Sequence, residues 1–164
     1  MTHIRNRMEG AMRAALLTSL VILLALPAAA EVATPYPATM IIETGRPFAK
    51  FLKKLDAAIG KNKMGIVARA CASCGARSIG VTIPGNRVIM IFRPDLAVRM
   101  LKASVAAGIE APLRIYVTER PDGRARLTYR LPSSIFAPYR VEELDAMAGE
   151  LDKIMARIVA DAMK

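Results

Sequence analysis

The chain has few of the residues that carry the commonest enzyme chemistry. Among its 164 residues there is one histidine, His3, and there is no tryptophan. Imidazole is the usual partner of a catalytic serine or cysteine and a frequent metal ligand. Residues after His3 contain no histidine. The sequence therefore excludes, for this part of the chain, Ser-His-Asp and Cys-His catalysis, histidine-bound metals and a histidine switch near neutral pH.

Several motifs are missing as well. The sequence has no Gly-x-Ser-x-Gly nucleophile elbow, no phosphate-binding loop and no dinucleotide fingerprint. Glu142 and Glu143 are neighbours on a predicted helix, where they suit the helix start better than a shared acid–base site. Aromatic residues are 5% of the chain and form no stacking run between basic residues, so we expect no nucleic-acid partner. We expect no cofactor and no metal, because two cysteines without histidine leave zinc two ligands short.

Long apolar runs are also scarce, and the longest lies near the N-terminus. Three basic residues, Arg5, Arg7 and Arg13, precede an uncharged stretch over residues 14–30 that ends in three alanines. A basic start, a short apolar centre and small residues at the end are typical of a signal peptide. We therefore predict a signal peptide over residues 1–30, cleaved between Ala30 and Glu31.

The alternative is a membrane anchor that is never cleaved. A spanning helix needs about 20 apolar residues, whereas this run is shorter, contains Thr18 and Ser19, and is broken by Pro27. We expect an exported protein, periplasmic or secreted, that contacts the membrane only through the signal segment before cleavage. A Pro/Ala-rich tether over residues 31–38 is expected to lead into a single domain over residues 39–164.

The sequence is basic, with a net charge of +10. Once the three arginines and Glu9 of the predicted signal peptide are left out, 21 basic and 13 acidic residues remain, a net charge of +8. Such a charge favours anionic partners, and it also serves plain solubility.

Hydrophobic periodicity predicts strands over residues 39–43, 64–69 and 88–92. A hairpin with strands over residues 113–119 and 124–130 is predicted around the turn Pro121-Asp122-Gly123, and its arginines are expected on an exposed face. Helices are expected to begin at Pro47 and Pro94, because proline fits the first helical position. We expect the first helix to end at Gly60 in a left-handed cap. The second is expected to bury Leu96, Met100 and Leu101.

A longer helix is predicted at the C-terminus. Apolar residues keep a 3.6-residue period over residues 141–162, and acidic residues lie at its start. One interpretation is that the apolar stripe docks on the sheet, and the other is that it forms a contact between two copies of the chain.

Several segments together resemble the domain of unknown function 302 family. They are Ile83–Pro94, Ala111–Val117, Asp122-Gly123 and Leu127–Pro132. The resemblance covers about residues 40–139, and Arg93 stands where the family usually has asparagine. It implies an α+β fold that resembles the TATA-binding protein, with a mostly antiparallel sheet of four to five strands and helices on one face. It also implies a homodimer, and it supplies no catalytic residues.

Cys71 and Cys74, in Cys71-Ala72-Ser73-Cys74, are the one motif with obvious chemistry. They are interpreted as a structural disulfide, as a catalytic dithiol, or as unlinked thiols. A thioredoxin-like arrangement is favoured by residues 108–113, which resemble the proline loop that faces the active site in that fold. It also needs a long helix after the first cysteine, and Gly75, Gly80 and Pro84 leave no room for one.

A second candidate site is a small-anion site at Asn86, Arg87 and Arg93. Asn86 and Arg87 lie in a predicted loop, and Arg93 lies at the start of a helix whose first amides lack partners. The alternative is that Asn86 only shapes the turn and that Arg93 pairs with a nearby carboxylate.

Our expectation is an exported, non-enzymatic domain, dimeric, that binds a small molecule or a protein. The alternative function is a periplasmic dithiol/disulfide oxidoreductase that uses Cys71 and Cys74.

Overall fold

The computed structural model describes residues 36–164, so the predicted signal peptide (1–30) and most of the predicted tether (31–38) lie outside the described residues. The strands are β1 (Thr39–Pro47), β2 (Gly65–Ala70), β3 (Asn86–Phe92), β4 (Leu113–Glu119) and β5 (Arg124–Arg130). The α-helices are α1 (Phe48–Lys61), α2 (Ala72–Ser78), α3 (Pro94–Ala103), α4 (Pro132–Phe136) and α5 (Glu142–Ala162). Two 3-10 helices complete the fold, η1 (Ala106–Glu110) and η2 (Ala137–Tyr139).

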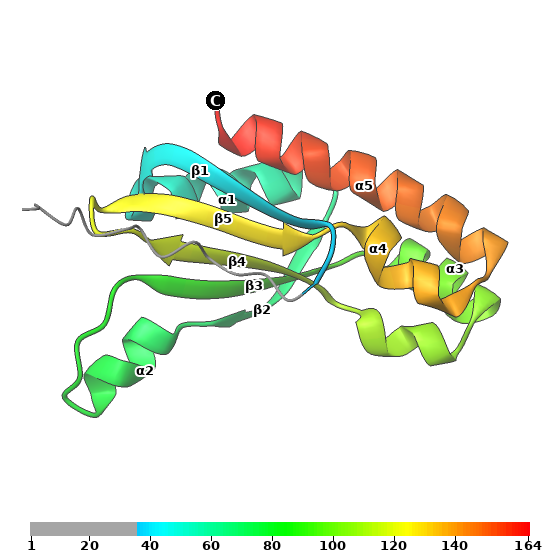
Figure 1. Cartoon of the computed structure of the whole chain (residues 1–164), viewed down its shortest axis with the longest axis horizontal. Helices are drawn as coiled ribbons and strands as arrows, with labels where there is room; N and C mark the ends of the chain where they lie inside the picture. The colour runs from blue at the N-terminus through cyan, green and yellow to red at the C-terminus, as the bar shows by residue number, and fades with distance from the viewer. Residues whose placement is uncertain (1–35) are drawn as a thin grey trace, which may run out of the picture. The chain divides into compact units, whose positions relative to one another are not determined.

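The five strands form one antiparallel sheet in the order β1-β5-β4-β3-β2 (Figure 1). The β4–β5 hairpin has the predicted bounds, and its turn contains Gly123 with φ 75°, a conformation that glycine adopts without strain. The predicted α+β class, with an antiparallel sheet and a long C-terminal helix, is confirmed.

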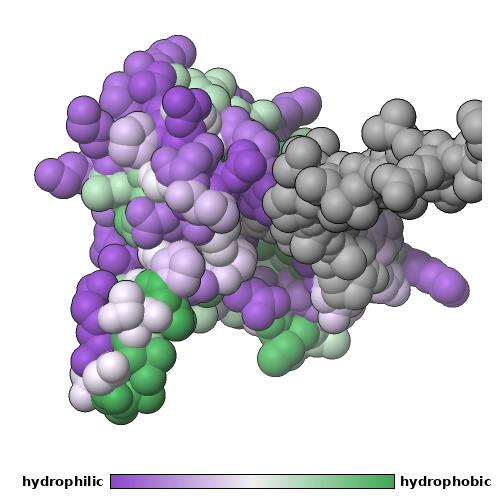
Figure 2. Space-filling model, turned by 60° about the vertical axis from the view of Figure 1, so that its left-hand side comes forward, coloured by the Kyte–Doolittle hydropathy of each residue, from purple (hydrophilic) through white to green (hydrophobic). Residues whose placement is uncertain are grey.

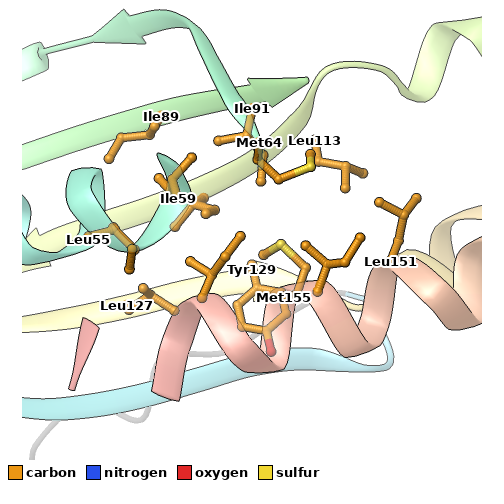
Figure 3. Packing of buried hydrophobic residues seen from close by; sticks show 14 of the residues in the cluster. Leu55, Ile59, Met64, Ile89, Ile91, Leu113, Leu127, Tyr129, Leu151 and Met155 are labelled. Carbon is orange, nitrogen blue, oxygen red and sulfur yellow. The ribbon is translucent and has the colours of Figure 1, made fainter. Parts of the chain in front are cut away.

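One face of the sheet is buried. Ile89, Ile115 and Leu127 on three adjacent strands are each at most 1% exposed, because side chains alternate between the two faces of a strand. They pack with residues of α1 and α5, and Figure 3 shows Leu151 and Met155 of α5 meeting the sheet residues. We call the other side the open face.

Helix α1 begins and ends differently from the prediction. Pro47 is the residue before the helix, and Phe51, Leu55 and Ile59 form its buried stripe. Gly60 is not the left-handed cap, because the helix continues to Lys61. Asn62 ends it: its backbone N–H and its Nδ2 both donate to the carbonyl oxygen of Ala58, at 3.1 and 2.9 Å.

Helix α3 begins at Pro94 as predicted, and Leu96 and Met100 are buried. Leu101 is 45% exposed, so its predicted place in the stripe is wrong. The reason is geometric, because Leu96 and Met100 are four residues apart on one helix face, whereas Leu101 is turned about 100° away from Met100.

Helix α5 uses its apolar stripe within its own chain. Eight of its residues are buried against the rest of the domain: Leu144, Met147, Ala148, Leu151, Ile154, Met155, Ile158 and Ala162. Docking on the sheet is therefore the correct interpretation of this periodicity.

Residues 71–85, between β2 and β3, form a projection that we call the arm; it includes α2 and extends away from the rest of the domain (Figure 1). The arm rejoins the sheet at Gly85, whose N–H donates to Glu119 Oε2 at 2.8 Å while Glu119 N–H donates to the Gly85 carbonyl at 2.7 Å. A Cβ on Gly85 would lie 2.6 Å from the ring of Phe48, so glycine is required there.

Candidate functional site

The structure joins Cys71 and Cys74 in a disulfide on the arm. Cys71 precedes the first residue of α2 and is half-buried, whereas Cys74 is exposed. The backbone N–H of Cys74 donates to Cys71 Sγ at 3.1 Å, and Ser73 Oγ lies 3.6 Å from the same sulfur. As the sequence indicated, no long helix follows; α2 has seven residues, and Gly80 with φ 76° follows it.

The thioredoxin-like arrangement is not formed around this disulfide. Cys71 directly follows Ala70, which pairs with Val88, and Val88 pairs with Tyr116. The proline loop precedes Leu113, at the opposite end of β4. It lies about three to four residues along β4 from Tyr116, the residue aligned with Ala70, so roughly 10–13 Å along the strand separate the proline loop from the start of the Cys71–Cys74 segment. Any exchange chemistry of the pair must therefore depend on its own surroundings.

Two arginines surround the exposed sulfur. Arg77 Nη2 and Arg87 Nη1 each lie 3.7 Å from Cys74 Sγ. The sequence predicts Arg87 in an anion site and gives no signal for Arg77. Arg77 follows Cys74 by three residues. Had the short helix α2 been predicted, Arg77 and Cys74 would have been expected on the same face of that helix.

The three residues of the predicted anion site are not brought together. Asn86 and Arg87 begin β3, whereas Arg93 follows its last residue, about 20 Å along the strand. Asn86 Nδ2 donates to the Tyr116 hydroxyl at 2.5 Å, and Arg93 Nε donates to Asp95 Oδ1 at 2.8 Å. Each of these two side chains therefore has a partner within the chain.

A hollow of about 240 Å³ lies where the strands meet η1 and α4. Its apolar wall includes Val88, Leu113, Pro132, Ile135 and Met155, and its polar lining includes Thr39, Glu110, Arg114, Tyr116, Thr128 and Arg130. The sequence could not reveal this hollow, because its lining combines residues from seven separate elements, and two of these, η1 and α4, are too short to show a hydrophobic period.

Two arginines line this hollow, and neither has a carboxylate partner within residues 36–164. Arg114 and Arg130 form no ion pair there. Arg130 Nε is buried and has no hydrogen-bond partner in the described structure, and its guanidinium carbon lies 4.6 Å from the ring centroid of Tyr36. A buried donor without a partner is costly, so an acceptor entering the hollow would find a favourable contact there.

The acidic residue of the hollow is already engaged. Tyr139 donates its hydroxyl to Glu110 Oε1 at 3.1 Å. Burial, and then this bond to Glu110, raise the pKa of Tyr139 above its ordinary value, so the phenol stays protonated and continues to donate. Glu110 therefore binds a protein donor instead of an arginine of the hollow.

Two further arginines of the β4–β5 hairpin share one carboxylate. Arg126 Nε and Arg120 Nη1 donate to the carboxylate of Glu43 at 2.6 and 2.9 Å. Partial burial raises the pKa of Glu43, but the hydrogen bonds from Arg126 and Arg120 outweigh it and leave the pKa below its ordinary value. Glu43 is thus ionised at neutral pH, and its single negative charge offsets part of the positive charge of these two arginines.

Within residues 36–164, no helix has the length and the apolar character needed to cross a membrane. The same residues contain no group of three or more histidine, cysteine, aspartate or glutamate side chains placed to hold a metal ion.

Residues 40–162 match the family model described as "Domain of unknown function DUF302". The chain belongs to this family. The DUF302 match includes α5, which lies beyond the segments on which the resemblance in sequence was based. It also includes the arm and the hollow, so both candidate sites are parts of the DUF302 domain.

The DUF302 chain is similar to the crystal structure of an uncharacterized conserved DUF302 protein from Bacillus stearothermophilus. The TM-score is 0.69 at 12% sequence identity, over 77% of this chain and 98% of that one. At this identity the similarity shows a shared fold and no more. No curated protein matches the chain.

Proposed function

We propose that this DUF302 protein is an exported domain and that its hollow is a non-enzymatic binding site, whose ligand is a small anion with an apolar part. The observation that carries the proposal is the pair Arg114 and Arg130, which line one hollow without carboxylate partners in the described structure. Their charge selects an anion, and the apolar wall favours a hydrocarbon part beside it.

The chemistry of the hollow supports binding of a carboxylate in particular. A guanidinium offers parallel N–H donors that match two carboxylate oxygens. The Tyr116 hydroxyl and the Thr128 side chain also line the hollow and provide uncharged polar contacts. A volume of about 240 Å³ suits a molecule of a few carbon atoms rather than a peptide or a sugar chain.

The test is calorimetric titration of hexanoate into the purified chain, with uncharged hexanol as the comparison ligand. Hydrogen bonds to charged groups contribute about 1.5–3 kcal/mol, so Arg114→Gln and Arg130→Gln are each expected to weaken hexanoate binding by at least about tenfold. Arg124→Gln is the matched control, because Arg124 is an exposed arginine of the same hairpin outside the hollow.

Hexanol is expected to bind much more weakly than hexanoate and to show no dependence on the two arginines. The proposal is wrong if hexanoate does not bind, or if it binds the hollow variants and the Arg124→Gln control with equal affinity.

A further inference from the structure

The arm presents its disulfide next to exposed apolar side chains. Ile79, Val81 and Ile83 on the same segment are 77%, 46% and 38% exposed. Figure 2 shows an apolar patch at the projecting end of the molecule, where the arm lies. Exposed aliphatic side chains grouped in this way mark an interaction surface more often than a solvated one.

The two sulfurs of this disulfide differ in what surrounds them. Cys74 Sγ is exposed and has two guanidinium groups at 3.7 Å, whereas Cys71 Sγ is half-buried and accepts the Cys74 N–H at 3.1 Å. An attacking thiolate is an anion and is drawn to the positive charges beside Cys74. A thiolate leaving from Cys71 keeps the N–H donor that it already has.

We propose that the Cys71–Cys74 disulfide accepts electrons from a dithiol of a partner protein, and that Cys74 is the sulfur attacked. This activity is separate from ligand binding in the hollow and needs no ligand there.

The exchange proceeds in two balanced steps. A thiolate of the partner attacks Cys74 Sγ, a new S–S bond forms, and the bond to Cys71 breaks, so Cys71 leaves with the electron pair as a thiolate. The partner's second thiolate then attacks its own first sulfur, forms the partner's disulfide and releases Cys74 as a thiolate. The partner loses two electrons and two protons, and the Cys71–Cys74 disulfide becomes two thiols.

The composition of the arm indicates the chemistry of the partner's surface. Residues 71–85 contain no aspartate or glutamate, and Arg77 and Arg87 supply positive charge beside the disulfide. The apolar side chains Ile79, Val81 and Ile83 add an uncharged contact surface. The complementary partner is a protein dithiol beside an apolar spot with acidic side chains at its rim.

Two measurements on the purified chain test the exchange itself. Reduced glutathione, added in limiting amount and then quenched with acid, is expected to leave its mixed disulfide on Cys74, as located by peptide mass analysis. In a graded series of glutathione buffers the pair is expected to open and close reversibly. A disulfide that stays closed in every buffer, or an adduct mainly on Cys71, would overturn the proposal.

Reduction rates test the partner's chemistry. The probes are two reduced Cys-x-x-Cys peptides that carry leucine, one flanked by glutamates and the other by lysines, with dithiothreitol as a small uncharged reductant. The acidic peptide is expected to react about three to ten times faster than the basic one at low salt, and the difference should shrink as salt rises. Arg77→Gln combined with Arg87→Gln is expected to remove this preference.

Ile79→Ser separates docking from chemistry. It is expected to slow reduction by both leucine-containing peptides several-fold and to leave reduction by dithiothreitol unchanged. Arg124→Gln is the control and should alter neither rate, because the Arg124 side chain pairs with Asp122 and makes no hydrogen bond to either sulfur of the disulfide. Equal rates for the acidic and basic peptides, or no effect of Ile79→Ser on either peptide, would overturn the assigned partner surface.

Discussion

At the scale of single residues, the carboxylate of Asp161 at the end of α5 accepts hydrogen bonds from three side chains. Lys61 Nζ and Lys164 Nζ each lie 2.9 Å from its Oδ1, and Asn62 Nδ2 donates to its Oδ2 at 3.1 Å. The bond from Lys61, then those from Lys164 and Asn62, hold the pKa of Asp161 well below its ordinary value of 3.8. This cluster links the end of α1 to the end of α5.

The lowered pKa gives Asp161 a pH-dependent contribution to stability. A carboxylate whose pKa is lower in the folded state stabilises that state above its ordinary pKa, and this contribution is lost as the pH falls below 3.8 toward the folded pKa. We predict that Asp161→Asn lowers the urea midpoint at pH 7 and that its deficit relative to the unmodified protein narrows as the pH falls below 3.8. Glu143→Gln, which removes an exposed carboxylate of α5 with no ion-pair partner in residues 36–164, is the control. A deficit that stays constant across this pH range would contradict the assignment.

The sequence identified which residue types carry chemistry, and it could not identify their partners. The sequence indicates the arginines of the β4–β5 hairpin, yet Arg126 pairs with Glu43 of β1, a contact across 83 positions of sequence, while Arg130 has no carboxylate partner within residues 36–164. Arg87 was assigned to a site with Arg93, and the structure places it beside Cys74. Pairings of this kind depend on the order of strands in the sheet, which no local pattern reports.

At the scale of elements, α5 illustrates how a helix is held by burial. Its apolar residues face the sheet and α1, and Asp152 at its centre accepts the backbone N–H of Ser133 at 3.0 Å, which links it to α4. Arg99 also donates twice to Glu150, at 2.8 Å each, and so links α3 to α5. The helix is therefore held by the sheet and α1, by α3, and by α4, the α-helix that precedes it in the chain.

Removing one buried side chain from α5 should have a large effect. Ile158 is fully buried, and Ile→Ala changes in a packed core cost about 2–5 kcal/mol, because apolar contacts are lost and a cavity remains. We predict a loss of this size in the free energy of unfolding for Ile158→Ala, measured by guanidinium denaturation. Arg157→Ala, the adjacent exposed position, is expected to change it by less than about 0.5 kcal/mol. Similar losses for both variants would contradict the described packing.

Elements in which the hydrophobic pattern repeats several times, or which flank a clear turn, could be predicted from the sequence, whereas short elements could not. The sequence predicts both hairpin strands and the start of α3 at the observed residues, because the Asp122-Gly123 turn and Pro94 mark these ends, and it predicts α5 to within one residue, because the pattern of α5 repeats over several turns. Helices α2 and α4 have seven and five residues, too few for a period to emerge. The end of α1 was misplaced because the Asn62 cap depends on side-chain bonds and not on the glycine before it.

At the scale of the whole molecule, the homodimer implied by the family resemblance remains a prediction. The stripe of α5 is already buried in its own chain, so a second copy would have to use another surface. Exposed aliphatic side chains on α3, on η1 and on the link between them offer one such surface: Val98, Val105 and Ile109 are 53%, 79% and 82% exposed. A dimer built there would leave the arm free for a partner.

Export is the last property that belongs to the whole molecule. The family match begins at residue 40 and the described fold at residue 36, so cleavage after Ala30 removes none of the described elements. Expressed in full in a bacterium with a periplasm, the chain is expected there with the intact mass of residues 31–164. Ala28→Lys with Ala30→Lys should leave the chain uncleaved, because the peptidase needs small residues at these positions, whereas Ala33→Ser should be processed normally. A full-length product from the unmodified chain, or a mature N-terminus far from Glu31, would contradict the predicted signal peptide.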